Sequence, residues 1–247
     1  HRRSSAASDV YKRQLPALTV LSDNITIVEV DQVKVVRVIH EKATAGIALH
    51  GGHVVSFTPV GQEDLIWMSD SAIFDGKVAL RGGIPICWPW FGRIAAPAHG
   101  FARTSEWSLL QHRENEQGVV IELGLKPSEQ TLSIWPHKFD ARLIIEVSNE
   151  LKVTLDVTNT DTTPWAFSGA LHTYLNVGNI KQAQTTGMGP EYIDSLKAGE
   201  ISQGDTVLQL TDTIDRVYTH PEAQILVKDP VLDLSLIHIS EPTRQHH

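Results

Sequence analysis

The sequence predicts an all-β protein, a large antiparallel β-sandwich, from three observations. Apolar and polar residues alternate with a period of two along much of the chain, which is typical of strands that bury one face. Turn-forming residues interrupt these runs at short and even intervals. Only one short segment has a helical pattern. Many short strands with so little helix indicate two antiparallel sheets packed face to face.

The alternation defines the strands in chain order. Along 151–157, leucine and valine alternate with polar residues, so one face of this strand is apolar. Residues 119–125 repeat the pattern. By the same reasoning, further strands are expected at Asn24–Val30, Lys34–Ile39, Thr44–His50, His53–Thr58, Trp107–Arg113, Phe139–Val147 and Trp165–Thr173.

Turns and one helix separate these strands. The helix is expected at Ser128–Trp135, because the Ser128 hydroxyl can accept a hydrogen bond from a free amide of the first turn and Pro136 would end the helix. The turn sequences are Gly51-Gly52, Pro59–Gly61, Glu116–Gly118, Asn149-Glu150 and Asn159–Pro164.

Both ends of the chain are expected to lie outside the fold. Residues 1–14 are basic, lack the apolar stretch of a secretory signal and resemble a translated sequencing adapter. Ser235–Gln245 also resembles an adapter, so 235–247 is interpreted as a second non-native segment. The remainder, 15–234, is predicted to be one domain that lacks its C-terminal strands. An ordinary basic tail and a short terminal strand are the alternative.

Composition limits the partners and the compartment. Of the 247 residues, 41% are hydrophobic, yet no window approaches the roughly 18 apolar residues of a membrane span, so no membrane is expected. The formal charge of -8 repels nucleic acid. The single cysteine, Cys87, excludes a disulfide framework and fits the cytoplasm. Its apolar neighbours favour packing over a nucleophilic role.

The segment Leu80–Arg103 does not fit a strand. It reads LRGGIPICWPWFGRIAAPAHGFAR, and its prolines lack the amide donor of a sheet ladder. A long ordered loop is usually functional; a structural loop packed by its own aromatic residues is the alternative. Arg81 and Arg103 flank it and could hold a phosphate or carboxylate with paired bonds. Gly82 and Gly83 would let backbone amides approach the same anion.

Several side chains in and near this loop have two interpretations. Trp88 and Trp90 could offer flat surfaces to a sugar ring, or they could anchor the loop in the core. His50 and His53 form a His-Gly-Gly-His sequence that could mimic a metal pair, but no third ligand follows at a suitable spacing, and no metal site is predicted. His172, near a strand end, is either a hydrogen-bonded core residue or a catalyst.

Common catalytic motifs are missing from the sequence. It contains no Walker loop, no GxGxxG after a strand, no GxSxG elbow and no HExxH. Nucleotide binding, serine hydrolysis and zinc proteolysis therefore lack their usual sequence support.

Four short motifs together give the chain a family resemblance. They are Arg81–Pro85 (RGGIP), His99–Arg103 (HGFAR), Ala170–Tyr174 (ALHTY) and Asp215–Tyr218 (DRVY). In this order they are similar to the hexose-6-phosphate mutarotases, the glucose-6-phosphate 1-epimerases of the galactose-mutarotase-like superfamily. The likeness extends from about Leu15 to Leu234.

The resemblance implies a β-sandwich that interconverts the anomers of a hexose 6-phosphate on a concave sheet face. It implies that Arg81 and Arg103 hold the phosphate, that Asp215 binds sugar hydroxyls and that His172 is the general acid. His99 would lie close to the substrate and help to bind it. Anomer exchange consumes no net bond, so no cofactor is expected. We expect a monomer.

The chain departs from the family pattern at two places. Ala98 stands where the family often has Gln before the histidine of HGFAR, which removes one polar contact. The family's general base is a Glu on a strand near the C-terminus, in a Val-Glu-Ala-like context, and nothing here matches it. No base is assigned; Glu200 and Glu222 are available carboxylates outside that context.

Three other functions remain open at this point, and one of them is a structural sandwich with no sugar role. The first is an aldose 1-epimerase for unphosphorylated sugars, which would have little use for two clustered arginines. The second is a non-catalytic carbohydrate-binding sandwich, which the missing base favours.

Overall fold

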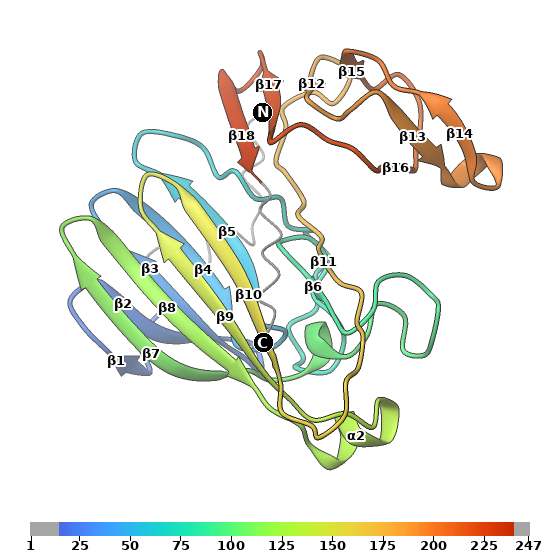
Figure 1. Cartoon of the computed structure of the whole chain (residues 1–247). Coiled ribbons are helices and arrows are strands. Elements are labelled where there is room, and N and C mark those ends of the chain that lie inside the picture. Colours follow the sequence, from blue (N-terminus) through green and yellow to red (C-terminus); the bar gives the residue numbers. More distant parts are fainter. Residues whose placement is uncertain (1–14, 240–247) are drawn as a thin grey trace. The chain divides into compact units, whose positions relative to one another are not determined.

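The computed structural model describes residues 15–239, which form two compact units, 15–176 and 177–239 (Figure 1). The sequence predicts one domain that ends at Leu234. The predicted adapter-like segments 1–14 and 240–247 lie outside the described residues, whereas 235–239 belong to a strand. All paired strands of the described sheets are antiparallel, so the all-β fold class is confirmed.

The first unit begins with a five-stranded sheet whose neighbours in sequence are also neighbours in space. The period of two sets which side each residue faces: in the third strand, Val36 and Val38 join one apolar cluster, while Val33 and Val35 join another on the opposite face. The strands are β1 (Thr19–Val20), β2 (Ile25–Val30), β3 (Val33–Ile39), β4 (Ala43–Ala48) and β5 (His53–Pro59).

A four-stranded sheet follows, in the order β10-β9-β8-β7. Alternate side chains of its two central strands, such as Ile121, Leu143 and Ile145, are fully buried. Each such side chain stabilises the fold by about 1.5–3 kcal/mol. The strands are β7 (Ser108–Asn115), β8 (Gly118–Leu125), β9 (Phe139–Val147) and β10 (Leu151–Asn159).

The two sheets share one core, which confirms the predicted sandwich (Figure 1). Apolar residues of β3 to β5 and of β8 and β9 form a single buried cluster. Trp88 and Phe101 of the predicted loop and Trp107, which follows it, belong to the same cluster. The opposite face of the first sheet is covered by Met68 and Leu80. The first sheet is therefore buried on both faces.

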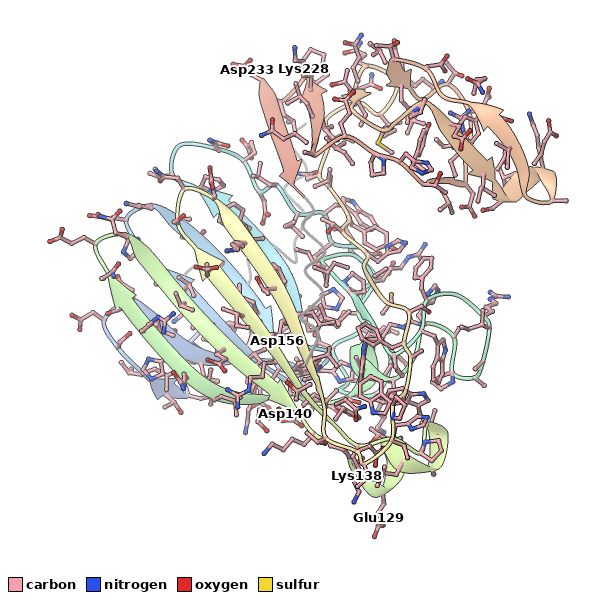
Figure 2. The ribbon with its side chains drawn as sticks, in the orientation of Figure 1. Glu129, Lys138, Asp140, Asp156, Lys228 and Asp233 are labelled. Carbon is pink, nitrogen blue, oxygen red and sulfur yellow. The ribbon has the colours of Figure 1, made fainter. Side chains whose placement is uncertain are left out.

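The predicted helix is confirmed as α2 (Glu129–Ile134), with Ser128 at its N-cap. The Thr131 amide donates to Oγ of Ser128 at 3.2 Å, and the Ser128 amide donates to Oγ1 of Thr131 at 2.8 Å. This capping box satisfies two backbone donors. The helix precedes β9, near Lys138 and Asp140 (Figure 2).

The predicted strand Trp165–Thr173 is wrong for most of its length. Within this fully described range, strand is confined to β11 (Ala170–Leu171), which pairs with β6 (Ile86–Cys87). The Ser168 amide donates to the Pro89 carbonyl at 3.0 Å. The segment therefore pairs with a loop and joins neither large sheet. The pairing is short because Pro85 and Pro89 flank β6 and cannot donate a backbone hydrogen bond.

The second unit consists of two small sheets, ordered β15-β12-β17-β18 and β14-β13-β16. The sequence predicts no strand in 177–234, because most of these strands have only three or four residues, and it predicts a short terminal strand only as the alternative to an adapter at 235–245. They are β12 (Gln184–Thr186), β13 (Glu191–Asp194), β14 (Glu200–Gln203), β15 (Val207–Gln209), β16 (Arg216–Tyr218), β17 (Gln224–Asp229) and β18 (Leu234–Ile239), with the 3-10 helix η3 (Ser195–Lys197). In the part of the chain that the structure describes, no helix has the length and apolarity to cross a membrane.

Candidate active site

The pairing of β6 with β11 brings two of the four motifs together. The His172 amide donates to the Pro85 carbonyl at 3.0 Å, and the Tyr174 amide donates to the Gly83 carbonyl at 2.9 Å. The two segments lie side by side, amid a dense group of side chains (Figures 1 and 2). The RGGIP and ALHTY motifs therefore run antiparallel, with His172 beside Pro85.

The turn that carries Arg81 is fixed through its backbone. The Ser69 amide donates to the Arg81 carbonyl at 3.0 Å. Gly82 has a φ of 102°, and a Cβ there would lie 2.6 Å from the Trp67 carbonyl oxygen. Glycine is therefore required for this close approach. The Arg81 side chain is exposed and free to reach a ligand.

The predicted loop folds back onto its own backbone. The amides of Phe101 and Ala102 both donate to the Trp88 carbonyl at 3.1 Å. The Trp90 indole donates to the Pro97 carbonyl at 2.9 Å. Trp88 and Trp90 are only 0% and 6% exposed, so neither offers a flat surface to a sugar. Both anchor the loop in the core.

His99 is held in one tautomer by this loop. The Gly92 amide donates to Nδ1 of His99 at 3.0 Å, so the neutral ring carries its proton on Nε2. The His99 amide in turn donates to the Gly92 carbonyl at 2.7 Å. Burial lowers the pKa of His99, and the charges of Arg103, His172 and Arg93 lower it further. A neutral His99 can donate a hydrogen bond from Nε2.

Arg103 lies in the short 3-10 helix η2 (Ala102–Thr104) that ends the loop. Its Nη2 donates to the Ala98 carbonyl at 2.9 Å, which orients the guanidinium. Its Nε is buried and has no hydrogen-bond partner within residues 15–239. A buried donor without a partner is costly, and an anion would satisfy it.

A row of rings connects the histidines of the two segments. Phe91 lies 5.0 Å from the His99 ring and is stacked on His172 at 5.9 Å, measured between centroids. The row continues to Tyr174, 5.0 Å from His172, and to Trp67, 5.8 Å from Tyr174. Phe91 and Trp67 are 43% and 38% exposed. They offer to a sugar ring the apolar surface that was predicted for Trp88 and Trp90.

Asp215, the remaining predicted site residue, belongs to the second unit. It directly precedes β16, and its carbonyl accepts a hydrogen bond from the Ser195 amide at 2.8 Å. Its neighbour Arg216 stacks on the Tyr192 ring at 4.0 Å. Glu200 begins β14 and Glu222 is exposed in a loop, so both carboxylates also lie in the second unit.

The His-Gly-Gly-His sequence has a different role from the metal pair that it could mimic. Nε2 of His50 donates to the Val78 carbonyl at 2.7 Å, and Nε2 of His53 donates to the Gly82 carbonyl at 2.6 Å. Among the described residues, no three His, Cys, Asp or Glu side chains gather as a metal site would require. Cys87 is buried, and burial raises the pKa of its thiol.

His53 should make stability depend on pH. Burial lowers its pKa from 6.5 to about 4, with smaller contributions from the charges of His50 and Arg103. The unfolded chain therefore binds this proton at higher pH than the folded chain, so the free energy of unfolding falls as pH drops from 6.5 toward 4. The shift corresponds to about 3 kcal/mol. Urea unfolding across this range should show a shallower pH dependence for His53→Gln; parallel curves would contradict the assignment.

Comparisons with known proteins give consistent matches. The sequence profile described as aldose 1-epimerase matches residues 34–246. A candidate glucose-6-phosphate 1-epimerase of Salmonella typhimurium is 35% identical over 239 residues, which are 94% of this chain and 78% of the relative. The crystal structure of a candidate mutarotase, YeaD, from Salmonella typhimurium has a TM-score of 0.88 at 34% identity, covering 94% of this chain and 78% of that one.

A more distant likeness concerns the fold alone. A galactose mutarotase-like protein from Lactobacillus casei has a TM-score of 0.64 at 18% identity. The match covers 82% of this chain and 78% of that protein. The sandwich is therefore of the galactose mutarotase type.

Proposed function

Because the chain belongs to the aldose 1-epimerase family, we propose that it is an isomerase that interconverts the α and β anomers of glucose 6-phosphate and related hexose 6-phosphates. One observation carries the choice of a phosphorylated substrate. Nε of Arg103 is buried without a hydrogen-bond partner among the described residues, and Arg103 and His172 both lie close enough to His99 for their charges to lower its pKa. A neutral sugar would leave that donor unsatisfied, whereas a phosphate would pair with it.

The reaction opens and recloses the sugar ring. A base removes the proton of the anomeric hydroxyl, the bond between C1 and the ring oxygen breaks, and an acid protonates that oxygen. Rotation about C1–C2 then presents the other face of the aldehyde, and reclosure reverses the proton transfers. We assign the acid to His172, because its exposed imidazole can meet a substrate and histidine donates a proton readily near neutral pH.

The other groups bind and orient the substrate. Arg81 and Arg103 are assigned to the phosphate, and the neutral His99 donates from Nε2 to an oxygen of the substrate. The phosphate is remote from C1, so its binding energy orients the ring. The assignment of Asp215 to sugar hydroxyls rests on the DRVY motif. The base is left unassigned, since neither Glu200 nor Glu222 has the family context.

A comparison of two sugars tests this proposal. After α-glucose 6-phosphate or α-glucose is dissolved, optical rotation follows the approach to anomeric equilibrium. We expect the protein to accelerate the phosphorylated sugar at least about tenfold more than glucose, because only the phosphate engages the arginines. Equal acceleration of both would instead identify an aldose 1-epimerase for unphosphorylated sugars.

The alternative function, a non-catalytic carbohydrate-binding module, predicts a different pair of results. A binding module would take up glucose 6-phosphate in calorimetry and leave the rate at the solvent value. The unpartnered Arg103 is compatible with binding alone, so the rate measurement decides between the two functions.

We further propose that the chain acts as a monomer in the cytoplasm. Its single cysteine, Cys87, is buried and free, which suits a reducing compartment. Light scattering at micromolar concentration should give the mass of one chain.

A further inference from the structure

The His-Gly-Gly-His sequence, residues 50–53, connects the two segments that carry the phosphate-binding arginines. It lies in the turn between β4 and β5 and ends on His53, the first residue of β5. One end contacts the segment of Arg103, and the other end contacts the turn of Arg81. We refer to residues 50–53 as the brace.

The first end of the brace is fixed to the residues around η2. The Gly51 amide donates to the Ser105 carbonyl at 2.7 Å, and His50 forms an isolated β-bridge with Glu106. Gly51 has a φ of 83°, and a Cβ there would lie 2.7 Å from the Arg103 carbonyl oxygen. The brace therefore lies directly against the backbone of Arg103.

The second end of the brace is fixed to the turn of Arg81. Nε2 of His53 donates to the Gly82 carbonyl at 2.6 Å. Gly83 lies so close that a Cβ at that position would overlap His53 Nε2 and the Val54 carbonyl oxygen. The Ile84 amide also donates to the Val54 carbonyl, at 2.9 Å. The peptide between Gly82 and Gly83, one residue beyond Arg81, is thus held by the side chain of His53.

The charge state of His53 suits this role. The side chain is completely buried, and Nδ1 has no hydrogen-bond partner among the residues described. Burial is the main cause that lowers its pKa to about 4, and the positive charge of Arg103 adds to this, so the ring is neutral at pH 7. A neutral ring donates one hydrogen bond to Gly82 and adds no charge that would compete with the arginines for an anion.

We propose that His53 is a positioning residue that holds the turn of Arg81 at a fixed separation from Arg103, and thereby sets the affinity of the site for a phosphate group. This inference rests on the proposed function. It assigns His53 to recognition of the phosphate and not to the chemistry at C1. Loss of the contact should therefore affect KM for a phosphorylated sugar more than kcat.

Two substitutions at His53 test this role. His53→Leu removes the donor at similar volume, and we expect KM for glucose 6-phosphate to rise about tenfold, because the buried Gly82 carbonyl loses its partner. We expect kcat to change less than about threefold. His53→Gln places an amide donor near the position of Nε2 and should restore most of the affinity. The acceleration of glucose should be the same in all three proteins.

A matched variant separates positioning from general stability. Val28→Ala removes volume from the buried cluster that also contains Met68 and Leu80, but it leaves in place the hydrogen bonds from residues 50–53 to both arginine segments. It should lower the melting temperature as His53→Leu does, with KM for glucose 6-phosphate unchanged. Affinity for inorganic phosphate, measured by calorimetry, should fall in His53→Leu only.

The possible outcomes distinguish this inference from the proposed function. If the wild type leaves glucose 6-phosphate at the solvent rate, the proposed function fails, and phosphate affinity alone decides the role of His53. If phosphate affinity is equal in wild type and His53→Leu, the positioning role is refuted. A parallel loss for glucose and glucose 6-phosphate, or the same KM rise in Val28→Ala, would also refute it.

Discussion

Replacing His172 with asparagine should lower kcat for anomerisation of glucose 6-phosphate by at least about 10²-fold, because asparagine cannot give a proton to the ring oxygen. Binding should change little. The backbone contact to Pro85 does not depend on the side chain, and Phe91 and Tyr174 still flank the position. Rates from exchange spectroscopy and affinities from calorimetry provide the two readouts.

A histidine on the same unit provides the control for that substitution. His137 contacts Trp135 and Asp161, beside α2 and apart from the RGGIP and ALHTY motifs. His137→Asn should leave both kcat and affinity unchanged. If His172→Asn lost turnover, affinity and thermal stability together, His172 would have a folding role and the acid would have to be sought elsewhere.

Replacing Arg103 with alanine should weaken the binding of glucose 6-phosphate by more than the roughly 1 kcal/mol of an exposed ion pair, that is, by more than about fivefold. The reason is the environment of the guanidinium: Nε is buried and lacks a partner in residues 15–239, so a bound phosphate gains a bond that water does not replace. Calorimetric titration measures the change, and affinity for glucose should stay constant.

Two further variants make the Arg103 result specific. Arg103→Lys keeps the charge but loses the planar fork, so its affinity should lie between those of the wild type and Arg103→Ala. Arg142→Ala removes an arginine that pairs with Glu122 and Asp140 on the exposed face of β9, and it should bind normally. Unchanged affinity in Arg103→Ala would refute the assignment of the phosphate.

Regular segments could be predicted from the sequence because their burial is one-sided. The strand at Phe139–Val147 has the predicted bounds, since every second residue is apolar and buried. The helix at α2 follows from Ser128 and Pro136, which act locally. In both cases the information lies within the segment and does not depend on tertiary contacts.

Other segments could not be predicted because distant partners determine them. Trp165–Thr173 contains the apolar residues of a strand, yet most of it lies along a proline-rich loop, where only Ala170 and Leu171 pair. Five of the described strands of the second unit, β12 to β16, have only three or four residues, which is too short for a period to be recognised. Two- to four-residue strands depend on their neighbours more than on their own sequence.

In the candidate site, too, some features follow from local sequence and others depend on contacts between distant segments. The motifs indicated Arg103, His99 and His172, and their relation through Phe91 is visible only in the fold. Trp88 and Trp90 are buried in the core, and the HGFAR backbone binds the Trp88 carbonyl through the amides of Phe101 and Ala102. The role of His53 could not be anticipated, since the carbonyl that it binds is 29 residues away in the sequence.

A crystal structure of the protein with glucose 6-phosphate tests the central claim most directly. The account predicts that the phosphate contacts the guanidinium groups of both Arg81 and Arg103, and that the ring oxygen lies within hydrogen-bond distance of the His172 imidazole. A phosphate bound away from those two arginines, or a sugar ring turned so that its oxygen cannot reach His172, would contradict it.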